Sequence, residues 1–254
     1  MADDTILAAV TPEPAGTAAT APAAPPAPPP PVAGPENGAP FEQLDGAGRV
    51  TFRGRMVDGA MHGETYDWGP RGKLQQRARV AGGRLHGELR RYDDDGTLAE
   101  VSQYADGVRH GDTAFFQHGR MVARMPFVRG LQDGEALYYS ANGLLAAAIP
   151  YRAGRIEGQA RYYDADGHLI RRAAHVADQQ DGPQVVYYPT GQVLETATFR
   201  AGLLEGEVKR YFPTGELMQR GLYRAGVLVE PMQTYSQAGR VTASIDPPPR
   251  PVVR

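Results

Sequence analysis

Residues 154–163, GRIEGQARYY, followed by the turn sequence DADGHL at residues 164–169, set the pattern of the whole chain. The stretch holds a glycine, a second glycine four residues later, an aromatic residue and then a third glycine. The same order returns at steps of about 24 residues in both directions. Periodicity of this length is typical of repeat proteins, in which each unit packs against its neighbours. The sequence therefore predicts an array of repeated units.

Eight units can be aligned by their glycine and aromatic columns. At position 178 an aspartate replaces the first glycine of its unit. We expect the second glycine of each unit to be structural, because a tight return turn needs positive φ. This column is Gly63, Gly87, Gly111, Gly134, Gly158, Gly182 and Gly206. The aromatic column is Trp68, Tyr92, Phe116, Tyr139, Tyr163, Tyr187, Tyr211 and Tyr235.

Each unit has the local signals of a β-hairpin. A run such as QARYY is followed by a turn rich in Asp, Pro, Thr and Gly and then by a second run such as QVLETATF. Glycine recurs too often for helices. The predicted fold is therefore all-β: an elongated antiparallel β-hairpin array, or solenoid-like ribbon, with disordered tails. With strands ~4.8 Å apart, eight hairpins would extend on the order of 75 Å.

Alternation along the second strand predicts a packed face. Val193, Glu195, Ala197 and Phe199 share one side when the strand is counted by two. We expect the aromatic column of the first strand to join that side, so that stacked hairpins form one continuous stripe of rings and small residues. Core packing is the main interpretation of these rings, and a ladder for ligand stacking is the alternative.

Composition divides the chain into three segments. Residues 1–38 are rich in proline and alanine and contain no lysine or arginine, which predicts a disordered tail. Residues 39–245 form the array, with an N-terminal cap near Phe41 and Leu44 before the eight units. Residues 246–254 are proline-rich and cannot extend a ladder, because proline lacks the N–H. Neither a membrane-spanning run nor a basic secretory leader is evident, so we expect a cytoplasmic protein.

Units such as YRAGRIEGQARYYDADG at residues 151–167 and FRAGLLEGEVKRYFPTG at residues 199–215 resemble the MORN repeat. The resemblance is closer to its bacterial variant, found in proteins named antitoxins of the YwqK type, and it covers about residues 48–245. It implies a non-catalytic hairpin array that binds another macromolecule. Antitoxins, scaffolds and membrane-associated proteins all use this fold, so the resemblance leaves several functions open.

The residues themselves favour a binding protein over an enzyme. The chain has no cysteine and none of the common nucleophile, phosphate-loop or zinc-protease motifs, so no cofactor is expected. His62, His86 and His110 occupy the same position in three consecutive units. Equivalent positions in adjacent hairpins lie roughly 9.6 Å apart, whereas ligands of one zinc ion lie within ~4 Å of each other. We therefore predict no metal site.

The same column continues as Asp133, Glu157, Asp181 and Glu205. These carboxylates predict an acidic edge that either keeps the sheet soluble or steers a basic partner, such as a toxin-like protein. The paired rings Tyr138-Tyr139 and Tyr162-Tyr163 make Tyr138 and Tyr162 further candidates for partner binding. The alternatives are a peripheral membrane or lipid-associated scaffold, for which no basic cluster is evident, and a carbohydrate- or cell-wall-binding array. The near balance of charge argues against a nucleic-acid partner.

Overall fold

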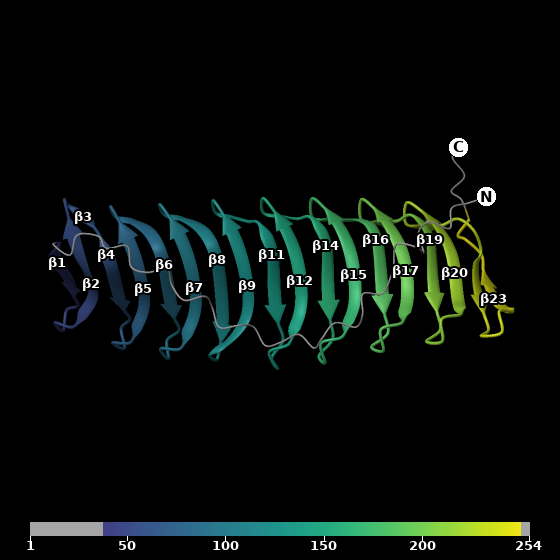
Figure 1. The fold of residues 1–254 in the computed structure, drawn as a ribbon, viewed down its shortest axis with the longest axis horizontal. Coiled ribbons are helices and arrows are strands. Elements are labelled where there is room, and N and C mark those ends of the chain that lie inside the picture. Colours follow the sequence, from purple (N-terminus) through teal and green to yellow (C-terminus); the bar gives the residue numbers. More distant parts are fainter. Residues whose placement is uncertain (1–37, 250–254) are drawn as a thin grey trace.

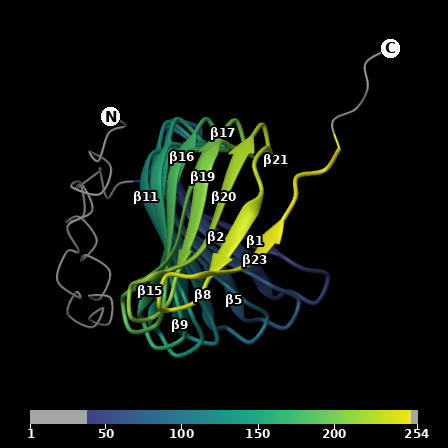
Figure 2. The ribbon, with the colours of Figure 1, turned by 90° about the vertical axis from the view of Figure 1, so that its right-hand side faces the viewer.

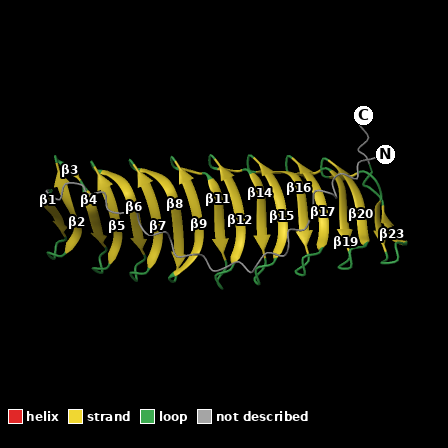
Figure 3. Cartoon of the chain, in the orientation of Figure 1, coloured by secondary structure: helices red, strands yellow, loops and turns green. Residues whose placement is uncertain are grey.

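The computed structural model describes residues 38–249, and in that range the chain forms one open antiparallel sheet of 23 strands with no helix (Figures 1 and 3). This confirms the predicted all-β array. Of the expected tails, residues 1–37 and 250–254 lie outside the described residues, and residues 246–249 contain no strand. The strands begin at Ala39 and end at Ile245.

Eighteen of these strands are the arms of nine hairpins, one for the cap and one for each of the eight units. The first arms are β1 (Ala39–Leu44), β4 (Gly63–Trp68), β6 (Arg84–Tyr92), β8 (Val108–Gln117), β11 (Gly134–Tyr139), β14 (Gly158–Tyr163), β16 (Gln179–Tyr187), β19 (Gly206–Tyr211) and β22 (Met232–Tyr235). The second arms are β2 (Val50–Val57), β5 (Leu74–Ala81), β7 (Leu98–Ala105), β9 (Arg120–Val128), β12 (Leu145–Arg152), β15 (Leu169–Val176), β17 (Val193–Arg200), β20 (Leu217–Arg224) and β23 (Val241–Ile245).

Five two-residue strands lie in the connections between hairpins: β3 (Ala60–Met61), β10 (Leu131–Gln132), β13 (Arg155–Ile156), β18 (Leu203–Leu204) and β21 (Val227–Leu228). Within a hairpin the arms pair along their length, as from Gly158↔His175 to Tyr163↔Leu169. Neighbouring hairpins are joined by fewer pairs, such as Ala147↔Tyr162 and Ala148↔Arg161. Eighteen long strands at ~4.8 Å spacing extend on the order of 80 Å. The end view shows that successive strands are turned relative to one another (Figure 2).

The sheet has two different faces. One face carries a line of mostly small residues at its centre, which includes Ala78, Leu89, Ser102, Ala136, Ala160, Ala173 and Ala197; we call it the small-residue face. These seven residues are at most 4% exposed. Because alternate residues of a strand point to opposite sides, their sequence neighbours project from the other face.

The small-residue face is closed over by its own large side chains. Tyr138 and Tyr151 lie on either side of the Ala136↔Ile149 pair and hydrogen-bond to each other through their hydroxyl groups. Burial, together with that bond, raises the pKa of Tyr151 to about 12. A single-layer sheet has no second layer to cover it, so small central residues flanked by long ones form its core.

The aromatic column does not lie on this face, and that part of the prediction is wrong. Each hairpin contains a register shift near its tip: Val186 pairs with Glu195, whereas the next residue, Tyr187, pairs with Val193. The extra residue Leu194 is a β-bulge, which places Val193 opposite Tyr187. Tyr187 follows Val186, whose partner Glu195 is on the small-residue face, so Tyr187 lies on the opposite face. There the Arg172 guanidinium lies 5.3 Å from its ring centroid and donates to its hydroxyl.

Turns between hairpins, which we call the connector edge, have two consecutive residues with positive φ. Ala153 and Gly154 have φ of 50° and 83°. This is the φ signature of a type I′ turn, whose twist matches that of the flanking strands. Asp178, which replaces a glycine in this column, also has positive φ (74°), a conformation that Asp tolerates better than most residues.

Candidate binding surfaces

The four predicted carboxylates of the connector edge all form the same contact. Each side chain accepts a backbone N–H from the turn that begins the next unit. The donors to Asp133, Glu157, Asp181 and Glu205 are Ala153 (3.1 Å), Ala177 (3.0 Å), Ala201 (3.0 Å) and Ala225 (2.9 Å). These acids therefore link consecutive units, in addition to any role in attracting a partner.

Exposed aliphatic side chains lie beside these carboxylates on the connector edge. Leu131 and Leu203 begin two of the connector strands, and both are about half exposed, at 52% and 51%. Val108 and Val227 occupy the equivalent positions of other units and are 45% and 51% exposed. The edge thus combines repeated apolar side chains with repeated carboxylates, a composition that favours contact with another protein.

Tyr138 and Tyr162 lie on the small-residue face, two hairpin arms apart. Both pair with Ala147, which separates them. Tyr162 packs under the guanidinium of Arg171, whose carbon lies 4.5 Å from the ring centroid. Both rings are half-buried, and neither lies with the connector carboxylates. The six predicted partner-binding residues thus belong to two separate surfaces.

A buried ionic cluster lies on the small-residue face of the earlier units. Glu100 is 7% exposed, accepts from the fully buried Ser102 hydroxyl and receives the Arg109 guanidinium at 2.5 Å. Arg91 lies 3.5 Å from the other carboxylate oxygen. In a later unit Glu195 occupies the position of Glu100 and pairs with Arg210 at 2.7 Å, but Ala197 replaces the buried Ser102.

The opposite face carries a line of cations that sequence inspection did not detect; we call it the arginine face. Strand pairing aligns Arg53, Tyr66, Arg77 and Arg90 in one direct row. Farther along the same row are Arg124, Arg161, Arg172, Lys209 and Arg220. Carboxylates flank this row, each two residues from the row position of its own strand. Two of them form ion pairs with arginines of neighbouring strands: Glu135 with Arg161 (2.6 Å) and Asp112 with Arg124 (2.5 Å).

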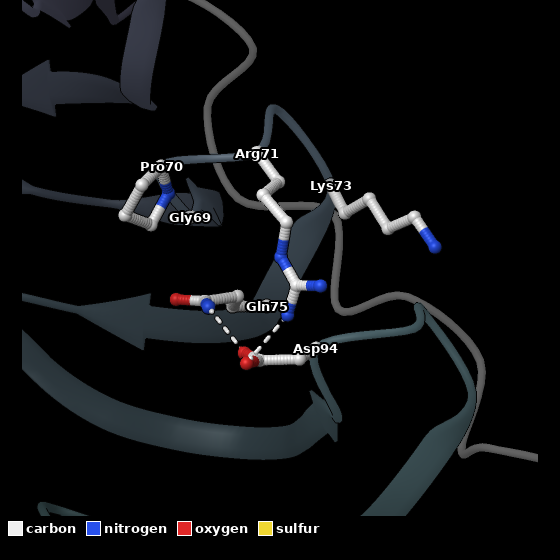
Figure 4. Close-up of a pocket in the computed structure, with 6 residues that line it drawn as sticks. All are labelled: Gly69, Pro70, Arg71, Lys73, Gln75 and Asp94. Atoms are coloured by element: carbon white, nitrogen blue, oxygen red, sulfur yellow. Dashed lines mark hydrogen bonds and ion pairs between the residues drawn. The ribbon is translucent and has the colours of Figure 1, made fainter.

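The hairpin tips form the second long edge. A recess of about 220 Å³ opens at the β4–β5 tip, where Arg71 and Gln75 both reach toward Asp94 of the next tip while Lys73 points away (Figure 4). The Arg71–Asp94 ion pair measures 2.6 Å, and the Gln75 amide donates to the same carboxylate at 3.3 Å. This volume is below the roughly 300–1,000 Å³ that is usual for small-molecule pockets.

One tip groups three potential metal ligands within the described residues. The donor atoms of Asp164, Asp166 and His168 lie within 4.8 Å of one another. Asp164 already accepts the backbone N–H groups of Asp166 and His168 at 3.0 and 2.9 Å, which is the geometry of an ordinary Asx turn. These bonds lower the pKa of Asp164, with the His168 N–H as the main cause.

Comparison with known proteins supports the repeat. Residues 85–106, 180–201 and 204–225 match the family model of the MORN repeat variant. Each match begins in a connector and continues through the first arm, the tip and the second arm, so it covers one structural unit. No curated protein matches the chain. Among residues 38–249 there is no helix that could cross a membrane.

Proposed function

We propose that this chain is a non-catalytic repeat array that binds a partner protein along its connector edge. The observation that carries the proposal is the repeated pairing there of half-exposed aliphatics, such as Leu131 and Leu203, with the carboxylates of Asp133 and Glu205. A basic protein with an apolar contact strip would complement this edge in both charge and hydrophobicity. An antitoxin or immunity role, suggested by the family resemblance, is the finer form of the proposal.

The apolar contribution is tested with the double variant Leu131→Ser/Leu203→Ser. Both side chains are half exposed, so the fold should be retained while the partner, recovered from the native host with the wild-type chain as bait, is lost. Val241→Ser is the matched control, because Val241 is 55% exposed but lies in the last strand, away from the connectors. Equal recovery with the double variant and the wild type would refute the proposal.

The carboxylates are tested by Glu157→Gln and Glu205→Gln, which remove charge but keep a side-chain oxygen for the Ala177 and Ala225 N–H groups. We expect slower association at low salt, by about two- to tenfold, with a nearly unchanged melting temperature. Reversal to lysine would be a poorer test, because it also removes the link between units. An unchanged association rate would restrict these acids to a structural role.

A further inference from the structure

We propose that the N-terminal part of the arginine face is a second docking surface, for an acidic, extended segment of a partner protein. It consists of Arg53, Tyr66, Trp68, Arg77 and Arg90 on strands β2, β4, β5 and β6; we call it the arginine–aromatic cluster. The proposal does not depend on the connector edge, which lies along the turns and attracts the opposite charge.

Two arginines of the cluster contact a stacked pair of rings. The Arg53 guanidinium carbon lies 5.6 Å from the centroid of the Trp68 ring, and Trp68 and Tyr66 stack at 5.9 Å with an interplanar angle of 22°. The Arg77 guanidinium carbon lies 6.0 Å from the centroid of the Tyr66 ring. A guanidinium held against a ring face keeps its N–H edges available for carboxylates. Trp, Tyr and Arg are also the residues most enriched at binding hot spots.

Register makes this end of the face basic although the whole chain has a net charge of −2. Arg77 and Arg90 stand directly opposite each other, an arrangement of like charges that destabilises a sheet unless it is offset. Together with the flanking positions of the same strands, five cations face three carboxylates here. The cations are Arg53, Arg55, Arg77, Arg79 and Arg90, and the carboxylates are Glu42, Glu64 and Glu88.

The existing ion pairs leave room for a ligand. Arg53 pairs with Glu42 at 2.7 Å and Arg77 with Glu64 at 2.5 Å, but the two guanidinium side chains remain 54% and 41% exposed. Exposed ion pairs contribute little to the free energy of folding. Replacing Glu42 or Glu64 with a carboxylate of the partner therefore costs little free energy. The arginine fork can also bind a second carboxylate.

An acidic peptide fits this surface better than a nucleic acid does. Nucleic acid carries a phosphate at every nucleotide, and a phosphate chain along the row would approach Glu64 and Glu88 as well as the arginines. A peptide can place carboxylates opposite Arg53 and Arg77 and apolar side chains on Trp68 and Tyr66. The row also runs across the strands, which suits an extended segment.

Trp68 provides a direct test, because it is the one tryptophan of the chain. The full chain is titrated with a peptide of about twelve residues in which glutamate alternates with alanine, while tryptophan fluorescence is recorded; parallel titrations use polylysine, oligothymidylate and phosphatidylserine vesicles. We expect the glutamate–alanine peptide to change the fluorescence in a salt-sensitive manner and to bind about tenfold more weakly to Arg53→Gln/Arg77→Gln. Arg210→Gln is the matched control, because Arg210 is 50% exposed and paired with Glu195 on the small-residue face.

Melting curves of both variants establish that they fold. The proposal is overturned if the glutamate–alanine peptide does not bind, if it binds the double variant and the control equally, or if oligothymidylate or the vesicles bind more tightly than that peptide. None of these outcomes affects the connector-edge proposal, which is measured with the Leu131→Ser/Leu203→Ser variant and the native partner.

Discussion

The two long edges of the array are both made of tight turns, yet they are held in different ways. At the connector edge each turn bonds to the preceding unit through its backbone: Gly154 N–H donates to the Gln132 carbonyl at 2.7 Å, and Ala153 N–H donates to Asp133. At the tip edge the turns close on themselves, as Asp164 shows, and tips are joined by side chains such as Asn142, which donates to the Ala165 carbonyl at 2.6 Å.

The difference indicates where coupling between units resides. Repeat proteins depend on interactions between neighbouring units, because an isolated hairpin is marginally stable. A change at the connector edge disturbs two units at once, whereas a change at a tip affects one turn. Equivalent substitutions at the two edges should therefore differ in their effect on stability.

The largest difference is expected between two glycines of one unit. Gly134→Ala, at the connector edge, forces an L-residue to φ of 115° and places Cβ 2.8 Å from Pro126 Cγ. At Gly143, in the tip, φ is 83°, but the Cβ added by Gly143→Ala would meet no atom within 4 Å. We expect a loss of about 3 kcal/mol or more in the free energy of unfolding for the first and about 1 kcal/mol for the second. Denaturant melts measure both, and equal losses would contradict the comparison.

A smaller difference is expected between two aspartates. Asp181→Ala removes the acceptor of the Ala201 N–H and should cost about 1–2 kcal/mol. Asp166→Ala should change stability by less than about 0.5 kcal/mol, because Asp166 contributes to its turn through its backbone N–H. Asp181→Asn, which keeps an acceptor oxygen, should recover most of the loss. If Asp181→Ala melts like the wild type, the carboxylate links are not important for stability.

Low pH should reduce the stability of the turns at the tips, which are closed by hydrogen bonds within each turn. The pKa of Asp164 is lowered from its usual value near 3.8, mainly by the His168 N–H, so the ionised carboxylate stabilises the folded state. That contribution is present above about pH 3.8 and is lost as the pH falls through the lower folded-state pKa. The advantage of the wild type over Asp164→Asn in melting temperature should therefore shrink between pH 6 and about pH 2. A constant difference would exclude this source of stability.

The smallest effect is expected for Ala165→Thr at the same tip. Ala165 is exposed, and its contact with the preceding tip uses its backbone carbonyl, which the substitution leaves in place. The free energy of unfolding should change by less than about 0.5 kcal/mol. A melt that shifts as far as that of Asp181→Ala would show that the tips, too, couple the units.

Much of the fold could be predicted from the sequence because it depends on local chemistry. The second residue of each connector turn has positive φ and is glycine in every turn but one, where it is Asp178, so turns such as that at Gly154 are visible as a column at a fixed period. The order of strands then follows from the repeat, since each hairpin must pack on the next. The carboxylates of Asp133 and Glu205 could also be placed on one edge, although their bonds to the backbone could not.

The face of the aromatic column was beyond the sequence. Alternation correctly placed Glu195, Ala197 and Phe199 on one face, but the bulge at Leu194 moves Val193 to the other face, opposite the ring of Tyr187. Nothing in the sequence around a tip distinguishes a bulged strand from a regular one, because both contain the same residue types.

The sequence by itself determined the repeat, its hairpins and the positions of its turns, because each depends on backbone conformations that few residues adopt. The tertiary structure decided which residues became neighbours across strands. Arg53, Arg77 and Arg90 are separated in the chain by acids, and the charges of the whole chain sum to only −2. Strand register brings them into one row, since pairing aligns residues by their position in the ladder and not by their distance along the chain.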